Sequence, residues 1–192
     1  MVSRRPTATE SAHPDDGLPA ATHLVGFARD LGPAGRVLDV GCGDGRLSAE
    51  LDAAALTLAD VSPVALRRAA ARLPEAAVTE LDPDAPLPFP DGAFDRVVCT
   101  ETVEHVRDVQ LLLSEVRRVL CPGGELALST PAHGRGTGLA MAVGGLERHM
   151  HPLSPHLRFF TRRSLRGLLE AMGFSVASLS RRGGTLLARA TR

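Results

Sequence analysis

The 192-residue sequence contains no Lys, Asn, Ile, Tyr or Trp, and all 22 of its basic residues are Arg. This bias follows codon GC content, so it indicates a GC-rich, bacterial genome and says little about chemistry. Only six aromatic residues are present, all of them Phe, and the net charge is zero. Because nucleic-acid-binding proteins rely on basic surfaces and aromatic stacking, no nucleic-acid partner is expected.

Long hydrophobic runs are also missing. No apolar stretch approaches the ~20 residues of a membrane-spanning helix, and the N-terminus lacks the apolar segment of a signal peptide. We therefore expect a cytoplasmic protein. Its three cysteines, Cys42, Cys99 and Cys121, are scattered through apolar segments, which predicts reduced, buried thiols rather than a disulfide framework or a zinc site.

The two parts of the chain carry opposite charge. Residues 133–192 contain ten Arg but only Glu147 and Glu170 as acids, a net charge of +8, so the remainder has a net charge of −8. A solvated surface explains such an imbalance most simply. An acidic or phosphorylated substrate near the C-terminal half is the alternative interpretation.

Strand and helix patterns alternate along most of the chain. Strands are expected at residues 36–40, 56–60, 75–81, 94–100 and 124–131, and helices at residues 18–31, 44–54, 61–73, 109–120 and 161–174. Ser62 and Thr161 are predicted helix N-caps, and Pro122-Gly123-Gly124 is the expected stop of the fourth helix. Such alternation predicts a parallel sheet with helices on both faces.

The end of the chain departs from this alternation. Residues 175–190 read as a hairpin around an Arg-Arg-Gly-Gly turn, so the sheet should finish with an antiparallel strand. We expect a mobile polar tail over residues 1–17 and a single domain over residues 18–192. Within that domain, residues 131–160 are too long for an ordinary connection and are predicted to be a functional insertion, with a composition that suits a lid.

The segment RVLDVGCGDGRLSAEL, residues 36–51, joins the first strand to a predicted helix through a G-x-G-x-G turn. In doubly wound sheets, ligands bind at the carboxyl ends of the strands. Glycines at positions 41, 43 and 45 allow unusual backbone angles and a close approach to a ligand. A dinucleotide-binding G-x-G-x-x-G turn would place its third glycine at position 46, where this chain has Arg46.

Several segments in order strengthen the interpretation of this turn. Asp60 ends the second strand, where a carboxylate can accept hydrogen bonds from ribose hydroxyls. The glycine turn resembles motif I of class I S-adenosylmethionine-dependent methyltransferases. Residues 81–106, 111–131 and 156–174 resemble the corresponding parts of the group that includes ubiquinone and menaquinone biosynthesis enzymes. The resemblance covers roughly residues 20–190. It implies S-adenosylmethionine as cofactor and a Rossmann-like α/β/α sandwich with seven strands in the order 3-2-1-4-5-7-6.

The same resemblance implies roles for individual residues at the cofactor. Asp60 would hold the ribose, and Val61 would pack against the adenine. The residues implied to line the methionine moiety are Asp39, Gly41, Cys42 and Gly43.

Further contacts are implied at the ends of the third and fourth strands. Leu81 and Asp82 would lie at the adenine edge, with Asp82 accepting a hydrogen bond from the exocyclic amine. Asp84 is the alternative in a shifted register. Thr100 and Glu101 would approach the methionine amino group or the methyl-transfer centre.

No catalytic base is evident in the sequence. The predicted insertion contains His133, His149, His151 and His156, any of which could serve as a base or contact the acceptor, and His133 and His151 are the preferred candidates. A histidine titrates near neutrality and so suits this role. Glu104 and His105 are interpreted as a structural pair. No metal site is expected.

The sequence is compatible to different degrees with four functions. A methyltransferase acting on a small molecule, most simply at an oxygen, is favoured. A non-catalytic module that binds S-adenosylmethionine is the main alternative, and an NAD-type oxidoreductase is disfavoured by Arg46. A nucleic-acid methyltransferase is disfavoured because no Asn-Pro-Pro-Tyr or Asp-Pro-Pro-Tyr tetrapeptide follows the fourth strand.

Overall fold

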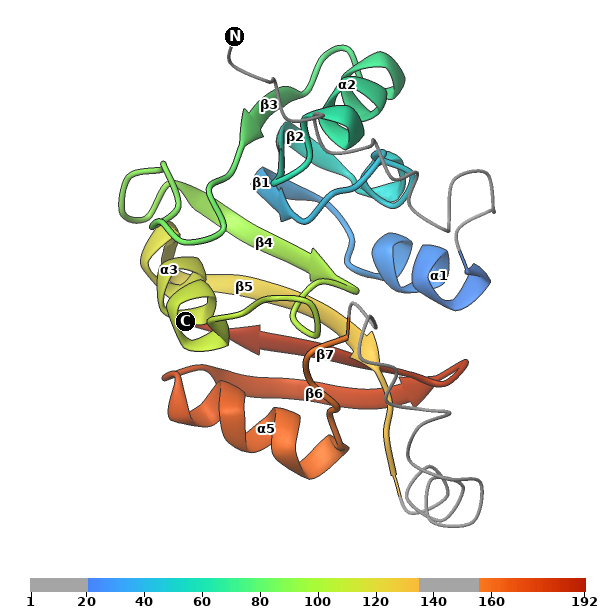
Figure 1. Cartoon of the computed structure of the whole chain (residues 1–192), viewed down its shortest axis with the longest axis vertical. Coiled ribbons are helices and arrows are strands. Elements are labelled where there is room, and N and C mark those ends of the chain that lie inside the picture. Colours follow the sequence, from blue (N-terminus) through green and yellow to red (C-terminus); the bar gives the residue numbers. More distant parts are fainter. Residues whose placement is uncertain (1–20, 135–155) are drawn as a thin grey trace, which may run out of the picture.

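The computed structural model describes residues 21–134 and 156–192. Their centre is a seven-stranded sheet in the order β3-β2-β1-β4-β5-β7-β6, which runs from the top to the bottom of Figure 1. The strands are β1 (Ala34–Val40), β2 (Ala53–Asp60), β3 (Ala77–Glu80), β4 (Phe94–Thr100), β5 (Leu120–Pro131), β6 (Ser175–Arg182) and β7 (Thr185–Thr191). Strands β1 to β5 pair in parallel, whereas β7 is antiparallel to both neighbours. The predicted strand order and antiparallel last strand are confirmed.

Helices cover both faces of the sheet. They are α1 (Thr22–Asp30), α2 (Pro63–Arg72), α3 (Val109–Val119) and α5 (Arg162–Ala171). Val37 of β1 packs with residues of α1, whereas its neighbour Leu38 packs with residues of α3 and α5. Successive strand residues point to opposite faces, so these helices form two separate layers. Leu58 of β2 packs against α2 and shares the face of Val37.

Both predicted helix caps are present. Ser62 Oγ accepts a hydrogen bond from the Ala65 N–H at 3.3 Å. Thr161 caps α5, and its side chain and that of Ser164 satisfy each other's backbone N–H groups. These bonds pair amides that the first turn of a helix leaves without intrahelical partners.

The predicted helix over residues 44–54 is wrong. Only a short 3₁₀ helix, η1 (Ser48–Glu50), forms there, and β2 already begins at Ala53. Ala53 aligns with Ala34 of β1, so the sheet register leaves only residues 46–52 between the glycines and the strand. That length does not accommodate two full helical turns.

The helix stop predicted at Pro122-Gly123-Gly124 is confirmed, because α3 has its C-cap at Leu120, but the next strand was expected only from Gly124. Helix α3 ends at Val119 and β5 begins directly at Leu120, so these three residues lie inside the strand. The register of β5 against β4 shifts at this place. Gly123 has a φ of +77°, and Pro122 has no N–H for the ladder. Both properties suit a bulge rather than a regular strand.

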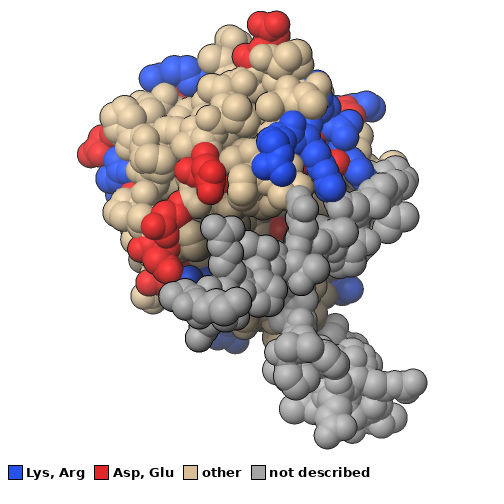
Figure 2. Space-filling view, turned by 45° about the horizontal axis from the view of Figure 1, so that its top comes forward, with Lys and Arg blue, Asp and Glu red and all other residues tan. Residues whose placement is uncertain are grey.

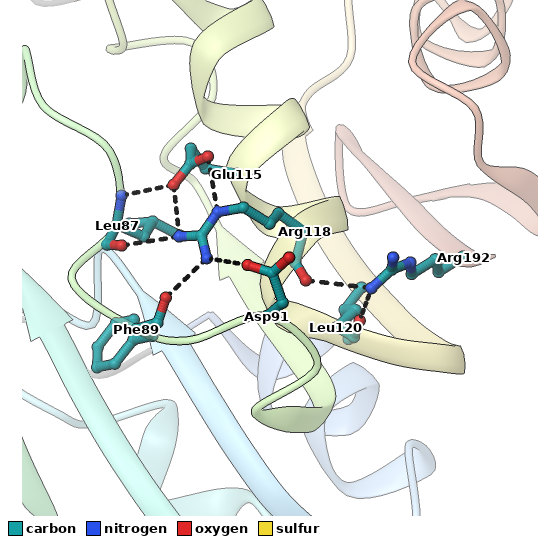
Figure 3. Close-up of polar contacts among 7 residues, drawn as sticks. All are labelled: Leu87, Phe89, Asp91, Glu115, Arg118, Leu120 and Arg192. Carbon is teal, nitrogen blue, oxygen red and sulfur yellow. Dashed lines mark hydrogen bonds and ion pairs between the residues drawn. The ribbon is translucent and has the colours of Figure 1, made fainter.

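Arg118 at the end of α3 holds the loop that connects β3 to β4 (Figure 3). Its guanidinium donates to the carbonyls of Leu87 and Phe89 at 2.9 and 2.8 Å and to the Asp91 carboxylate at 2.8 Å. Glu115 accepts from the same guanidinium at 2.7 Å and from the Leu87 N–H at 2.9 Å. The loop is therefore fixed to the helix by side-chain bonds, without regular secondary structure of its own.

The predicted tail and residues 135–155 of the predicted insertion lie outside the described residues. Among the residues described, no helix is long and apolar enough to cross a membrane.

Candidate cofactor and acceptor site

A cavity of about 1300 Å³ lies at the carboxyl ends of β1, β2 and β4. Pockets for a single small ligand commonly measure about 300–1,000 Å³, so this one has room for a cofactor and a second molecule. The site residues predicted from the sequence that line it are Gly41, Cys42, Gly43, Asp60, Val61, Leu81, Asp82, Thr100 and Glu101. The sheet topology thus brings together residues from four separate segments.

The three glycines of the turn at residues 41–45, the glycine turn, meet different surroundings. All have positive φ, from +55° to +78°. A Cβ on Gly41 would lie 2.3 Å from Oγ1 of Thr102, and one on Gly45 would lie 3.2 Å from Cα of Ala69. A Cβ on Gly43 would meet nothing within 4 Å. Gly41 and Gly45 are therefore required by packing, whereas Gly43 leaves its backbone open at the cavity.

Asp60 joins the glycine turn to the start of α2. Its Oδ2 accepts the Gly43 N–H at 2.9 Å, and its Oδ1 accepts the Ser62 N–H at 2.8 Å. Each carboxylate oxygen can accept a second hydrogen bond. Asp60 therefore fixes the turn and still has acceptor capacity for a ligand in the cavity.

Asp39 is not among the residues that line the cavity. It is buried behind the turn, where its Oδ2 accepts the Ser48 hydroxyl at 2.6 Å. Its Oδ1 has no hydrogen-bond partner among the described residues. Burial raises the pKa of Asp39 to about 6, with a smaller contribution from the nearby charge of Asp60.

Cys42 lines the cavity, and its main chain is hydrogen-bonded to the end of β2. Its N–H donates to the Ala59 carbonyl at 3.2 Å, and its side chain is buried against Leu58 and Leu66. Burial strongly raises the pKa of the thiol. A protonated, buried thiol is unreactive.

The residues after β3 form one wall of the cavity. Leu81 and Asp82 line it, and Oδ1 of Asp82 accepts the Asp84 N–H at 2.9 Å. Asp84 is not among the lining residues and pairs with Arg107 at 2.6 Å. Val61, which follows the last residue of β2, also lines the cavity and is 54% exposed although it is large and apolar.

Glu101 at the end of β4 has a φ of +49°, and no other described non-glycine residue has a positive φ. Its N–H donates to both the carbonyl and the hydroxyl of Ser129 at 3.1 Å, and its Oε1 accepts that hydroxyl at 2.7 Å. Burial raises the pKa of its carboxyl. Left-handed backbone held by neighbouring bonds often occurs at functional sites.

Two cavity residues, Glu104 and His105, were not expected at the site, whereas His156, one of the candidate histidines, does line the cavity. Glu104 is 1% exposed, and burial raises the pKa of its carboxyl to about 7. The side chain of His156 stacks near that of His105, with ring centroids 4.8 Å apart. Interpreting Glu104 and His105 only as a structural pair overlooked that both face the cavity.

Of the two preferred candidate bases, only His133 lies among the described residues, and it does not line this cavity. Its ring packs edge-on against Phe159, with centroids 4.7 Å apart. Burial lowers the pKa of its imidazole. His151 lies outside the described residues.

A doubly wound sheet with a glycine turn, an acidic residue ending β2 and a cavity over both defines a nucleoside-binding α/β protein. Comparison with known proteins refines this class. Residues 17–179 match the family described as "Methyltransferase domain", and the chain belongs to this family. Its cofactor is S-adenosylmethionine, as predicted.

Two curated relatives illustrate the sequence similarity. A probable S-adenosylmethionine-dependent methyltransferase of Mycolicibacterium smegmatis is 35% identical over 153 residues, which cover 74% of this chain and 53% of the relative. A ubiquinone biosynthesis O-methyltransferase of Xanthomonas campestris is 36% identical over 131 residues, covering 62% and 52% respectively. The chain spans about half the length of the curated relatives it matches.

Solved structures confirm the fold. A putative methyltransferase from Bacillus halodurans superimposes with a TM-score of 0.74 at 17% identity, covering 89% of this chain and 99% of the other.

The residues present fit this cofactor. Gly43 offers open backbone at the cavity, Asp60 retains acceptor capacity, and Val61 presents an exposed apolar surface suited to a purine ring. The cavity volume is ample for the nucleoside and its methionine arm.

Proposed function

We propose that this chain transfers the methyl group of S-adenosylmethionine to an oxygen of a small-molecule acceptor. The observation that carries the proposal is one cavity lined by the glycine turn and Asp60 and also by Glu101, Glu104 and His105. An oxygen acceptor is supported by the relative named as an O-methyltransferase.

In this proposal the cofactor is held mainly by backbone and one carboxylate. Gly41, Cys42 and Gly43 lie along the methionine moiety, and Asp60 accepts from the ribose hydroxyls. Asp39 acts from behind the turn, where it holds Ser48.

The adenine lies between the ends of β2 and β3 in the same proposal. Val61 and Leu81 pack against the ring, and Asp82 accepts from its exocyclic amine. Asp82 is preferred to Asp84 because Asp82 lines the cavity, whereas Asp84 pairs with Arg107.

The bound cofactor supplies a methyl group activated by a positively charged sulfur. The task of the chain is to hold the acceptor oxygen in line with that methyl, and positioning of this kind can lower a barrier by about 7–11 kcal/mol. Thr100 and Glu101 lie at the end of β4, next to the glycine turn, and orient the methionine arm. The acceptor proton leaves toward the carboxylate of Glu101 or Glu104 or the imidazole of His105.

A negative charge on the acceptor has less support than the oxygen has. The excess of Arg in residues 133–192 was the reason to expect an acidic molecule. Arg158, which lies beside the cavity residue His156, uses its guanidinium on the carbonyls of Val106 and Arg107. Arg158 therefore gives no support to an acidic acceptor, whereas Arg46, Arg68 and Arg107, from outside residues 133–192, line the cavity. The face shown in Figure 2 carries both Arg and acidic side chains. A nucleic-acid substrate would favour a face that is basic throughout, so this face gives no support to one.

The test is turnover with a panel of hydroxylated small molecules and matched amines and thiols, with S-adenosylhomocysteine release as the readout. We expect release with at least one hydroxylated acceptor and an O-methyl product by mass spectrometry. Asp60→Ala should suppress release, whereas Asp84→Ala should not. Cofactor binding without turnover on any acceptor would instead support the non-catalytic module, and binding of NADH would revive the oxidoreductase.

A further inference from the structure

Three side chains with metal-binding atoms meet at the wall of the cavity. Glu104, His105 and His156 each offer one such atom, and these atoms lie within 4.8 Å of one another. Oε1 of Glu104 is 3.9 Å from Nε2 of His105. This group, the Glu-His-His cluster, faces the same cavity as the glycine turn.

The carboxylate of Glu104 is buried but only half satisfied. Its Oε2 accepts the Thr130 hydroxyl at 3.0 Å, whereas Oε1 has no hydrogen-bond partner among the described residues. A buried carboxylate oxygen without a partner is unfavourable and calls for a donor or a cation. The bond from Thr130 orients the carboxylate so that Oε1 is the oxygen directed at His105.

Backbone hydrogen bonds hold the distant member of the cluster in place. The N–H groups of Leu157 and Arg158 donate to the Glu104 carbonyl at 2.8 and 3.2 Å. The Arg158 guanidinium donates to the carbonyls of Val106 and Arg107. The chain segment that carries His156 is therefore attached to the loop that carries Glu104 and His105.

We propose that Glu104, His105 and His156 bind one divalent transition-metal ion, with Zn²⁺, Co²⁺ and Mn²⁺ preferred over Mg²⁺ and Ca²⁺. Two imidazoles and one carboxylate suit these ions, whereas Mg²⁺ and Ca²⁺ select oxygen ligands. Tetrahedral Zn²⁺ places its ligand atoms about 3.4 Å apart, so separations of up to 4.8 Å in the cluster must shorten by up to about 1.4 Å on binding. Movement of two histidine side chains at a cavity wall provides this.

An ion held by three protein ligands keeps a coordination position open to the cavity. Resting on the proposed function, we assign that position to the acceptor oxygen, whose hydroxyl pKa the ion would lower. With Glu104 and His105 bound to the ion, Glu101 is the group left to take the acceptor proton. Metal binding itself does not depend on methyl transfer, so the two proposals can fail separately.

The test is calorimetry of the untagged, metal-stripped chain with Zn²⁺ and with Co²⁺, with the visible absorption of bound Co²⁺ as a second readout. We expect one ion per chain and little binding of Mg²⁺. Glu104→Gln and His105→Asn should each weaken binding by at least about tenfold and change the Co²⁺ spectrum. Retained S-adenosylhomocysteine binding in both variants shows that they are folded.

His133→Asn and Asp84→Asn are matched controls, because each removes a similar group outside the cluster. Both should bind the ion as the unmodified chain does. The proposal is overturned if the unmodified chain binds neither ion, if Mg²⁺ binds as tightly, or if the controls lose binding as much as the cluster variants do. Turnover that is unaffected by removal of a bound ion would overturn the assignment of the acceptor oxygen alone.

Discussion

The backbone N–H of Gly43 donates to Oδ2 of Asp60 at 2.9 Å, so the glycine turn and the end of β2 form a single unit. The other oxygen of the carboxylate accepts from Ser62 at the start of α2. One side chain thus fixes the glycine turn, along which the methionine moiety is proposed to lie, to the end of β2, where the ribose is proposed to lie.

Asp60→Ala should weaken S-adenosylhomocysteine binding by at least about tenfold. It removes the proposed ribose acceptor and leaves two backbone N–H groups without their partner, which should lower the free energy of unfolding by about 1–3 kcal/mol. Calorimetry and denaturant unfolding measure the two effects. Asp84→Ala is the control, since its exposed pair with Arg107 contributes about 0–1 kcal/mol. Equal effects of the two substitutions would contradict the role of Asp60.

Gly43→Ala and Gly45→Ala should separate binding from packing. The new methyl at position 43 points into open space at the cavity, so cofactor binding should fall while stability drops only by the 1–2 kcal/mol typical of a left-handed alanine. At position 45 the methyl would also press on Cα of Ala69 at 3.2 Å, so we expect a larger loss of stability. The idea is contradicted if thermal unfolding finds equal losses of stability for the two variants and calorimetry finds unchanged cofactor binding for Gly43→Ala.

Arg118→Ala should loosen the loop after β3. The variant loses the bonds to Leu87, Phe89 and Asp91 and leaves Glu115 without its cation. We expect a loss of about 1–3 kcal/mol in stability and weaker S-adenosylhomocysteine binding, because this loop carries Leu81 and Asp82. Arg166→Ala, which breaks only an exposed pair with Glu170, is the control. If the two variants bind the cofactor alike, the loop does not depend on Arg118.

The buried Asp39 should make stability depend on pH. Its pKa is about 6 in the folded chain and about 3.8 when unfolded, so the folded state binds more protons between these values. The contribution of Asp39 to the free energy of unfolding should therefore fall as pH rises from about 4 to 6, by up to about 3 kcal/mol, and then level off.

Asp39→Asn removes this titration, while that of Glu104, which has the same sign, remains in both proteins. The difference in unfolding free energy between the two proteins should therefore change with pH over the window of Asp39 alone. A difference that is constant from pH 4 to 7 would show that Asp39 keeps its ordinary pKa.

Local patterns were sufficient to predict most of the helices and strands, whereas the strand order and the residues expected at the cofactor came from the family resemblance. The N-caps at Ser62 and Thr161 and the strand that ends at Asp60 are read from neighbouring residues. The failed helix over residues 44–54 was decided by the pairing of Ala34 with Ala53, a contact between strands that no local pattern contains.

The Glu-His-His cluster could not be predicted for the same reason, because it also depends on a contact between distant segments. His156 meets His105 only because Leu157 and Arg158 bond to the carbonyl of Glu104. The spacing of Glu104 and His105 was visible in the sequence, but not the burial that leaves Oε1 of Glu104 without a hydrogen-bond partner among the described residues.

A crystal structure with S-adenosylhomocysteine tests the cofactor assignment most directly. We predict the methionine moiety along Gly41–Gly43, the ribose hydroxyls within hydrogen-bond distance of the Asp60 carboxylate, and the adenine between Val61 and Leu81. A nucleoside bound elsewhere, or a ribose out of reach of Asp60, would contradict the proposed site.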